Sequence, residues 1–169
     1  MTKPPMPITI RPMQPADWPD VRRIYLEGIA TGNATFETDA PPSWDELDRN
    51  RLPVCRHVAE LGGAIVGWVM LSAISSRAVY RGVAEVSVYV ANEARGKGVG
   101  AALMEKLVDE SEALGFWTLQ AGILVENEAS IELHKRAGFR EVGRRERMGQ
   151  LRGKWRNVLL MERRSAIVE

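Results

Sequence analysis

The chain contains few of the residues that build metal sites, disulfides or membrane anchors. Among its 169 residues there is one cysteine, Cys55, and there are two histidines, His57 and His134. A single cysteine cannot form an internal disulfide, and no Cys/His cluster has the spacing of a zinc site, so we expect no metal. The longest apolar run, residues 64–71, is too short to cross a bilayer.

The sequence also lacks a strong net charge and a secretory leader. Its 23 basic and 22 acidic residues give a net charge of +1. No strong electric field therefore favours nucleic acid or an anionic membrane surface as a partner. The N-terminus has no basic segment followed by an apolar one, which a signal peptide would require. By elimination we expect a cytoplasmic protein without nucleic-acid or membrane partners.

What the chain does contain is the composition of an ordinary globular domain, with 45% hydrophobic and 27% charged residues. This length predicts one domain over residues 1–169, in which residues 1–6 form a loose tail. Hydrophobic periodicity and turn residues predict seven strands and four helices. The expected strands are 8–13, 54–60, 64–72, 83–90, 117–125, 139–145 and 156–163. The expected helices follow Asp17 and Ser43 as N-caps and cover 98–114 and 127–137.

The order of these elements predicts an α+β fold, that is, a mixed α/β architecture. Antiparallel strands come first in the chain and a β-α-β unit follows them. The segment 34–42 between the first two helices is a long loop that ends in two prolines.

A glycine-rich turn, Arg95-Gly96-Lys97-Gly98-Val99-Gly100, lies between an expected strand and an expected helix. Glycines allow close backbone approach, and the N-terminus of the helix offers unpaired N–H groups and positive charge to an anion. The turn therefore suits a diphosphate. It is not a P-loop, and Leu103 replaces the third glycine of a dinucleotide fingerprint. On glycine spacing alone, a flexible loop with a glycine cap explains it equally well.

The turn resembles the acetyl-CoA motif Arg-x-x-Gly-x-Gly of the GNAT N-acetyltransferase superfamily. The resemblance implies a mostly antiparallel twisted sheet of about seven strands, splayed between strands 4 and 5 and flanked by about four helices. It implies that acetyl-CoA is the cosubstrate. The implied cofactor contacts are Val88 and Val90 on the strand, and Arg95, Gly96, Lys97, Gly98, Val99 and Gly100 in the turn.

A second motif strengthens the resemblance. Asn127 to Phe139 looks like the family signature Asn-x-x-Ser-x-x-Leu-(Tyr/His)-x-x-x-Gly-Phe. In the family this implies that Asn127 binds the CoA arm and that Ser130 assists. Helix capping is the alternative for both residues, because Asn and Ser are good N-caps.

Glu85 and His134 are the candidate catalytic residues. Acetyl transfer needs a neutral amine, so a base must take a proton from the ammonium ion. Alternation places Glu85 on one strand face with Ser87 and Tyr89, and partial burial there would raise its pKa. Ordinary surface exposure is the alternative. His134 stands where many GNAT enzymes carry a tyrosine that protonates the departing thiolate. Tyr89 is a weaker candidate, for which aromatic packing is the preferred interpretation.

A narrower resemblance covers nearly the whole chain. Segments 35–37, 80–81, 85–90, 134–139 and 153–155 look like those of the phosphinothricin and methionine sulfoximine N-acetyltransferases. That family acetylates the α-amino group of small amino-acid analogues in detoxification or herbicide resistance, and its members are commonly homodimers. The implied substrate-binding residues are Phe36, Arg77, Tyr80 and Arg81. Arginine suits a carboxylate, although loop solvation is the alternative for Arg77 and Arg81.

Two departures from this family affect the substrate rather than the cosubstrate. The loop reads Ile74-Ser75-Ser76 where relatives often have a Trp-Arg or Trp-Lys pair. The stretch 149–153 reads GQLRG where relatives often have GFKFG. Acetylation of another small amine or of a protein N-terminus therefore stays open, as does a non-catalytic acyl-CoA-binding module.

Overall fold

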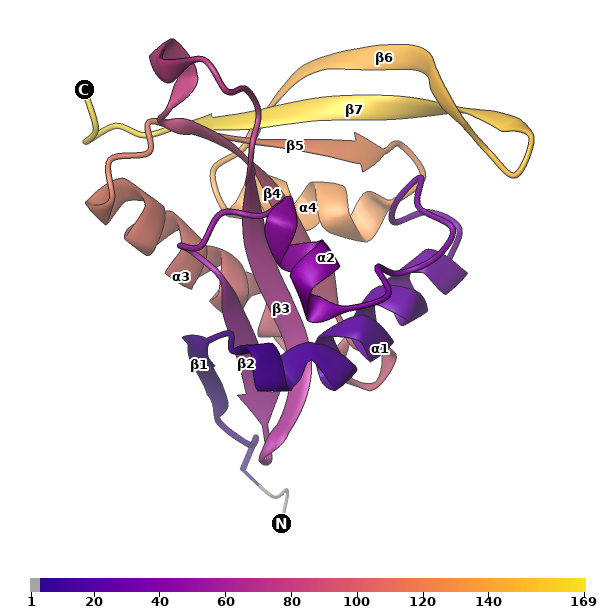
Figure 1. The fold of residues 1–169 in the computed structure, drawn as a ribbon, viewed down its shortest axis with the longest axis vertical. Coiled ribbons are helices and arrows are strands. Elements are labelled where there is room, and N and C mark those ends of the chain that lie inside the picture. The colour runs from indigo at the N-terminus through magenta and orange to yellow at the C-terminus, as the bar shows by residue number, and fades with distance from the viewer. Residues whose placement is uncertain (1–3) are drawn as a thin grey trace.

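The computed structural model describes residues 4–169, and the first three residues of the expected tail lie outside the described residues. Seven strands form one sheet in the order β1-β2-β3-β4-β5-β7-β6 (Figure 1). The strands are β1 (Ile8–Pro12), β2 (His57–Leu61), β3 (Ala64–Ala73), β4 (Val83–Val90), β5 (Thr118–Leu124), β6 (Arg140–Leu151) and β7 (Lys154–Arg164). The helices are α1 (Trp18–Ala30), α2 (Trp44–Arg49), α3 (Val99–Ala113) and α4 (Glu128–Arg136).

All neighbouring strands are antiparallel except β4 and β5. These two run parallel because α3 connects them as a crossover, which a parallel connection requires. Their ladder is short and covers only Val83–Glu85 against Thr118–Gln120. The α+β class, the seven strands, the four helices and the splay between strands 4 and 5 are thus confirmed.

The helices cover the two faces of the sheet in pairs, α1 and α2 on one face and α3 and α4 on the other (Figure 1). On the first face, Tyr89 stacks on Trp68 with ring centroids 4.7 Å apart, and Tyr25 of α1 meets both rings edge-on. On the second face, Leu103 and Met104 of α3 are fully buried against the sheet. The packing interpretation of Tyr89 is confirmed.

Three element boundaries were wrong. The second strand begins at His57 rather than residue 54, because Cys55 has a φ of 55° that interrupts extended structure. The last two strands are longer than expected and form a hairpin whose turn, Arg152-Gly153, has φ values of 51° and 77°. Two positive φ angles match the twist of a two-residue hairpin. Register shifts near 141–143 and 145–149 interrupt the alternation of inward and outward side chains along β6, so the sequence pattern did not reveal the full length of this strand.

The two expected N-caps have different outcomes. Ser43 caps α2 as predicted, since its hydroxyl accepts from Glu46 N at 3.3 Å. Asp17 does not cap α1 with its side chain. Its carboxylate accepts from Gln14 N at 2.8 Å and from both Nη atoms of Arg11, at 2.8 and 2.9 Å, so it fastens β1 to the turn that follows it.

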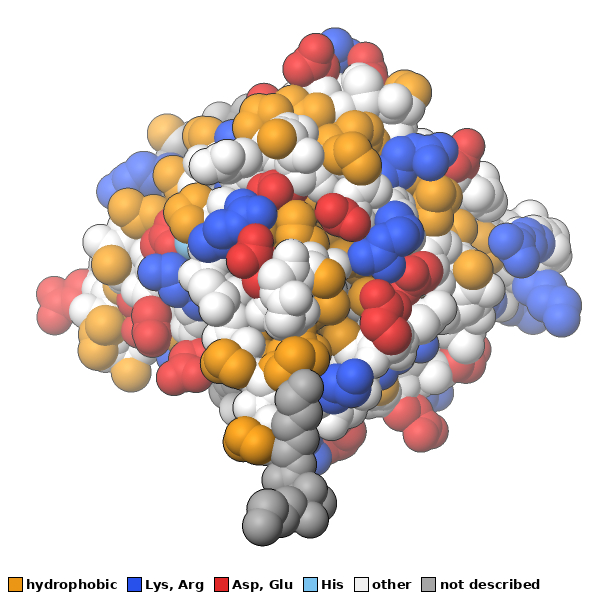
Figure 2. Space-filling model, turned by 90° about the horizontal axis from the view of Figure 1, so that it is seen from below, with side chains coloured by type: hydrophobic (Ala, Val, Ile, Leu, Met, Phe, Trp, Pro, Cys, Tyr) orange, Lys and Arg blue, Asp and Glu red, His pale blue; other side chains and the backbone are white. Residues whose placement is uncertain are grey.

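The surface around the N-terminal end of the sheet carries mixed charge. Figure 2 shows acidic and basic side chains lying next to one another at several places on this face, with hydrophobic and uncharged atoms between them. Among the ion pairs of the described residues are Arg11–Glu60 and Arg23–Glu27, with N–O distances of 2.7 and 2.9 Å. Within residues 4–169, no helix has the length and apolar character needed to cross a membrane.

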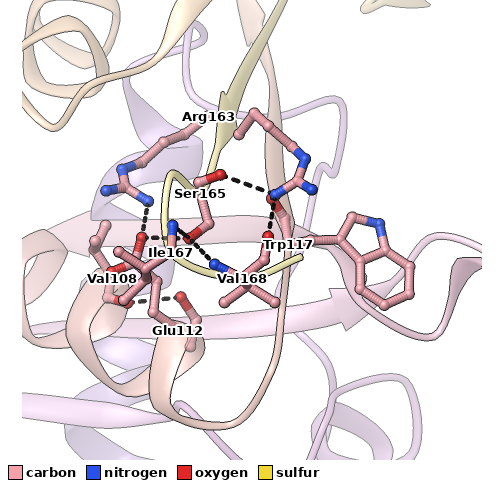
Figure 3. Close-up of polar contacts among 9 residues, drawn as sticks. Val108, Glu112, Trp117, Arg163, Ser165, Ile167 and Val168 are labelled. Carbon is pink, nitrogen blue, oxygen red and sulfur yellow. Dashed lines mark hydrogen bonds and ion pairs between the residues drawn. The ribbon is translucent and has the colours of Figure 1, made fainter.

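The C-terminus is fastened to the end of α3 by one carboxylate (Figure 3). Glu112 Oε1 accepts from Arg163 Nη1 and from Ser165 Oγ, each at 2.8 Å. The Ser165 hydroxyl in turn accepts from the backbone N–H groups of Ile167 and Val168. The hydrogen bonds from Arg163 and Ser165 hold the pKa of Glu112 below its ordinary value of 4.5.

Replacement Glu112→Gln is expected to lower Tm at pH 7 by about 2–4 °C, the shift that a loss of about 1 kcal/mol causes in a chain of this size. Because the folded pKa is depressed, the stabilisation is present above pH 4.5 and is lost as the pH falls through the lower folded pKa. Thermal unfolding of both proteins between pH 3 and 7 measures this, with Glu105→Gln on the same helix as control. A Tm difference that stays constant over that range would contradict the prediction.

Candidate functional site

A slot in the sheet opens where β4 leaves β5. Beyond Glu85, the residues Val86–Val90 of β4 pair with β3 on one side, and the described chain supplies no strand on the other. The peptide groups on that open edge need partners from a ligand or water. An extended ligand with amide groups can pair with them as an added strand would. Val88 and Val90 lie on this edge and are half-buried, and their contact with a CoA arm stays a prediction.

The glycine turn stands at the end of this slot. Gly96 and Gly98 have φ values of 73° and 83°, which glycine adopts without strain, and the residues 95–98 are exposed. Gly98 precedes α3 directly, so the N–H groups of the first helical turn point out of the helix end. Together with Arg95 and Lys97, this cradle fits the diphosphate of a CoA-type ligand.

The last two residues of the turn serve packing as well. Val99 is 1% exposed and belongs to the core. A Cβ atom on Gly100 would lie 3.1 Å from Leu133 Cδ2, so glycine lets α3 approach α4 closely here. Their expected contact with the cofactor can be made only through the backbone.

Asn127 caps α4, as the alternative interpretation predicted. Its Oδ1 accepts from Ser130 N at 3.2 Å. The cap occupies the side-chain oxygen, which leaves the Nδ2 donor as the group that Asn127 can offer to a ligand. A CoA contact of Asn127 or Ser130 stays a prediction.

His134 is buried, with 2% of its surface exposed, and its ring packs edge-on against Phe139. Its Nδ1 lies 2.7 Å from the carbonyl oxygen of Ser130. A carbonyl only accepts, so Nδ1 carries the proton and Nε2 carries the lone pair. Nε2 is buried and has no hydrogen-bond partner within residues 4–169. Burial lowers the pKa of His134 below 6.5, so the ring is neutral at pH 7 and can accept a proton but not donate one from Nε2.

Glu85 lies at the mouth of the slot, as the last β4 residue paired with β5. Its side chain is exposed rather than partly buried, and Oε2 accepts from Gln120 Nε2 at 3.2 Å. Among the described residues no hydrogen bond joins Glu85 to His134. The two candidates therefore do not form a hydrogen-bonded pair, and a ligand in the slot would have to connect them.

The expected substrate residues fall into two groups. Phe36 is half-buried against Leu124, Leu151 and Val158, and thus lies at the end of β5 beside the slot. Arg77, Tyr80 and Arg81 instead lie on the exposed loop before β4. The Arg77 guanidinium lies 5.6 Å from the centre of the Tyr80 ring, and that of Arg81 lies 5.4 Å from the Trp117 ring.

Sequence reasoning missed three residues of this region. Arg156 on β7 donates to Gly32 O at 2.8 Å and to Asn33 Oδ1 at 2.6 Å, and so holds the loop that carries Phe36. Gln120 contacts Glu85, and Arg51 reaches the β3–β4 face from the end of α2. None of them lies in a motif, and their contacts join segments far apart in the chain. Within residues 4–169, no group of three or more His, Cys, Asp or Glu side chains is placed to hold a metal ion.

Comparison with known proteins agrees with this geometry. Residues 15–139 match the model of the Acetyltransferase (GNAT) family. The chain belongs to the GNAT acetyltransferase family. The enzyme is therefore an acyltransferase with acetyl-CoA as cosubstrate. The slot and the glycine turn are the two features that the resemblance to this family led us to expect.

Three proteins show which GNAT acetyltransferases this one is similar to in sequence and in structure. It is 32% identical over 165 residues to the L-methionine sulfoximine/L-methionine sulfone acetyltransferase of Pseudomonas aeruginosa, covering 93% of this chain and 94% of the relative. A phosphinothricin acetyltransferase from Sinorhizobium meliloti, solved in complex with acetyl-CoA, superposes with a TM-score of 0.84 at 34% identity, over 93% and 88% of the chains. A ribosomal-protein-alanine N-acetyltransferase from Brucella melitensis gives 0.83 at 30% identity, over 93% and 99%.

Substitution Gly98→Val is expected to weaken acetyl-CoA binding about tenfold or more. A β-branched residue at a φ of 83° is strained by about 1–2 kcal/mol, and relief of that strain would distort the turn whose backbone N–H groups form the anion cradle. Calorimetric titration with acetyl-CoA measures the affinity. Gly115→Val, at a φ of 86° beyond the far end of α3, is the matched control for backbone strain. Equal affinity in the wild type and the Gly98 variant would refute this role of the turn.

The tautomer of His134 can be observed directly. In ¹⁵N-histidine-labelled protein, NMR is expected to show His134 with its proton on Nδ1 and less charged at pH 6.5 than an ordinary histidine, which is half charged there. His57 supplies the second signal, and a His57→Asn variant assigns the two. A charged ring, or a proton on Nε2, at that pH would contradict the geometry.

Proposed function

We propose that this enzyme acetylates the α-amino group of a small amino acid or analogue, of the phosphinothricin, methionine sulfoximine or methionine sulfone type. The names of the relatives at 32% and 34% identity support this acceptor class. The observation that carries the proposal is the position of Glu85, a solvent-accessible carboxylate at the point where β4 separates from β5.

Glu85 acts as the general base in direct transfer within a ternary complex. The acceptor amine is mostly an ammonium ion at pH 7, so it must lose a proton before it can attack. Bound acetyl-CoA supplies the activated acyl group. The open β4 edge positions that group beside Glu85, and the Glu85 carboxylate receives the proton directly or through water. Gln120 holds the carboxylate in place by its hydrogen bond at 3.2 Å.

His134 assists as a neutral side chain. Because Nδ1 is bound to the Ser130 carbonyl, only the Nε2 lone pair is left for catalysis or for ligand binding. In that state Nε2 can accept a hydrogen bond from a bound ligand but cannot protonate the thiolate that leaves. Proton delivery to the thiolate then comes from the proton that the amine released, or from water.

A second candidate is acetylation of a protein N-terminus, since the structural relative from Brucella melitensis is named a ribosomal-protein-alanine N-acetyltransferase. The loop 34–42 argues for a closed acceptor site instead, because Arg156 and the packing of Phe36 hold it against the end of β5.

Further expectations from the sequence stay predictions: a single domain, a homodimer, a cytoplasmic location, and a physiological role in detoxification or herbicide resistance. The β6–β7 hairpin supports the homodimer, since its exposed apolar side chains Val142, Met148 and Trp155 are 44%, 53% and 55% exposed. Such residues are typical of contact surfaces.

The experiment that tests the function is a screen of acceptors with thiol detection. Phosphinothricin, methionine sulfoximine and methionine sulfone are compared with simple amines and with an alanine-terminated peptide. Acetyl-CoA-dependent thiol release with the amino-acid analogues is expected. Release with the peptide alone would favour the second candidate, and binding of acetyl-CoA without turnover of any of these acceptors would contradict both proposed acceptor classes.

Glu85→Gln is expected to lower kcat by about 10²–10⁴-fold, the usual contribution of a general base. Acetyl-CoA affinity should change little, because Glu85 lies at the far end of the slot from the glycine turn. Stopped-assay kinetics measures kcat, and calorimetry measures the affinity for acetyl-CoA. Glu105→Gln on the outer face of α3 is the control. Undiminished kcat at neutral pH would remove Glu85 from the mechanism.

A further inference from the structure

Arg51 is fixed on the acceptor face of the sheet by two hydroxyl groups. Its backbone follows the short helix α2, and its Nη1 donates to Ser72 Oγ and to Ser87 Oγ, each at 2.8 Å. Ser72 belongs to β3 and Ser87 to β4. The next residue, Leu52, anchors this loop through a hydrogen bond from its N–H to the carbonyl of Leu71 at 2.8 Å. The guanidinium is therefore held against the sheet although it comes from a loop.

The register of β3 and β4 places this cation beside the candidate base. Ser72 is the direct cross-strand partner of Glu85, and Ser87 follows Glu85 on the same face of β4. Side chains of directly opposed residues in an antiparallel pair are neighbours, with Cβ atoms about 4.5–5.5 Å apart. The positive group of Arg51 and the carboxylate of Glu85 thus occupy adjoining positions on one face, at the mouth of the slot.

Arg51 forms no ion pair with a carboxylate within residues 4–169. Both of its hydrogen bonds go to neutral hydroxyls and use a single nitrogen, so Nη2 and Nε keep donors to offer. Other partly covered arginines are neutralised: Arg156 pairs with Glu126 at 3.0 Å and Arg163 with Glu112 at 2.8 Å. A half-buried cation without an anion is costly, and the cost is offset when an anionic ligand binds.

The positive charge of Arg51 also acts on two buried phenol groups. Burial raises the pKa values of Tyr25 and Tyr89. The Thr35 hydroxyl and the positive charge of Arg51 act against that rise, and the negative charge of Glu37 adds to it. A cation without an ion-pair partner and a neighbouring carboxylate are what the carboxylate and the ammonium group of a small zwitterion require.

We propose that Arg51 binds the α-carboxylate of the acceptor and so restricts this enzyme to free α-amino acids. An α-amino acid carries its carboxylate and its amine on one carbon, so binding the carboxylate at Arg51 turns the amine toward Glu85. The inference rests on the proposed function, and it assigns to Arg51 the role that the sequence suggested for Arg77 or Arg81. A residue at a protein N-terminus has no free α-carboxylate, so the same contact disfavours protein acceptors.

The test compares an acceptor with its uncharged counterpart, methionine sulfone and methionine sulfone amide, in full-length protein. Wild-type enzyme is expected to show a KM for the acid about 10- to 100-fold below that for the amide, as befits a charged hydrogen-bonded pair. Arg51→Met should raise the KM for the acid by a similar factor and bring the acid-to-amide ratio close to one. The KM for acetyl-CoA should not change, and Arg51→Lys should restore part of the preference.

Arg49→Met is the matched control, because Arg49 lies two residues away on α2 with its side chain 65% exposed. Equal KM values for acid and amide in the wild type would overturn the proposal without any variant. An undiminished preference in Arg51→Met, with thermal unfolding showing a folded protein, would overturn it as well. Failure of the wild type to acetylate either compound while it binds acetyl-CoA would overturn the proposed function itself.

Discussion

The short parallel ladder between β4 and β5 is the constraint on which the rest of the site depends. Three residue pairs hold the two strands together, after which each strand follows its other neighbour, β4 along β3 and β5 along β7. The main-chain groups of Val86–Val90 are left open along one edge as a consequence. A sheet that stayed fully paired would have no place for an extended cosubstrate.

The two ends of this slot supply different chemistry. At one end, positive φ angles at Gly96 and Gly98 bring backbone N–H groups and the positive helix end of α3 to an anion. At the other end, Glu85 and Arg51 present opposite charges on one face of the sheet. The distance between the two ends is bridged by the open strand edge, which can hold the amide-containing arm of the cosubstrate without any charged side chain.

Burial decides what His134 can do. A histidine on an exposed helix face would exchange protons near neutral pH, but this ring is covered and its Nδ1 is bound to the Ser130 carbonyl. Water cannot compensate a charge there, so the neutral form is favoured and the pKa falls. The same helix is capped by Asn127. The signature residues of this segment therefore stabilise α4, and only their polar atoms that the helix does not use are left to bind a ligand.

The sequence by itself determined the element order, the α+β class, the glycine turn and the position of Glu85 on one strand face, because each follows from local periodicity or from residues adjacent in the chain. It predicted neither the length of the β6–β7 hairpin, whose register shifts and charged residues conceal alternation, nor the exposure of Glu85 and the burial of His134. Only the tertiary structure brought Arg51 to Ser72 and Ser87, residues 21 and 36 positions away. Such contacts depend on how α2 packs on the sheet, and no local pattern in the sequence encodes that packing.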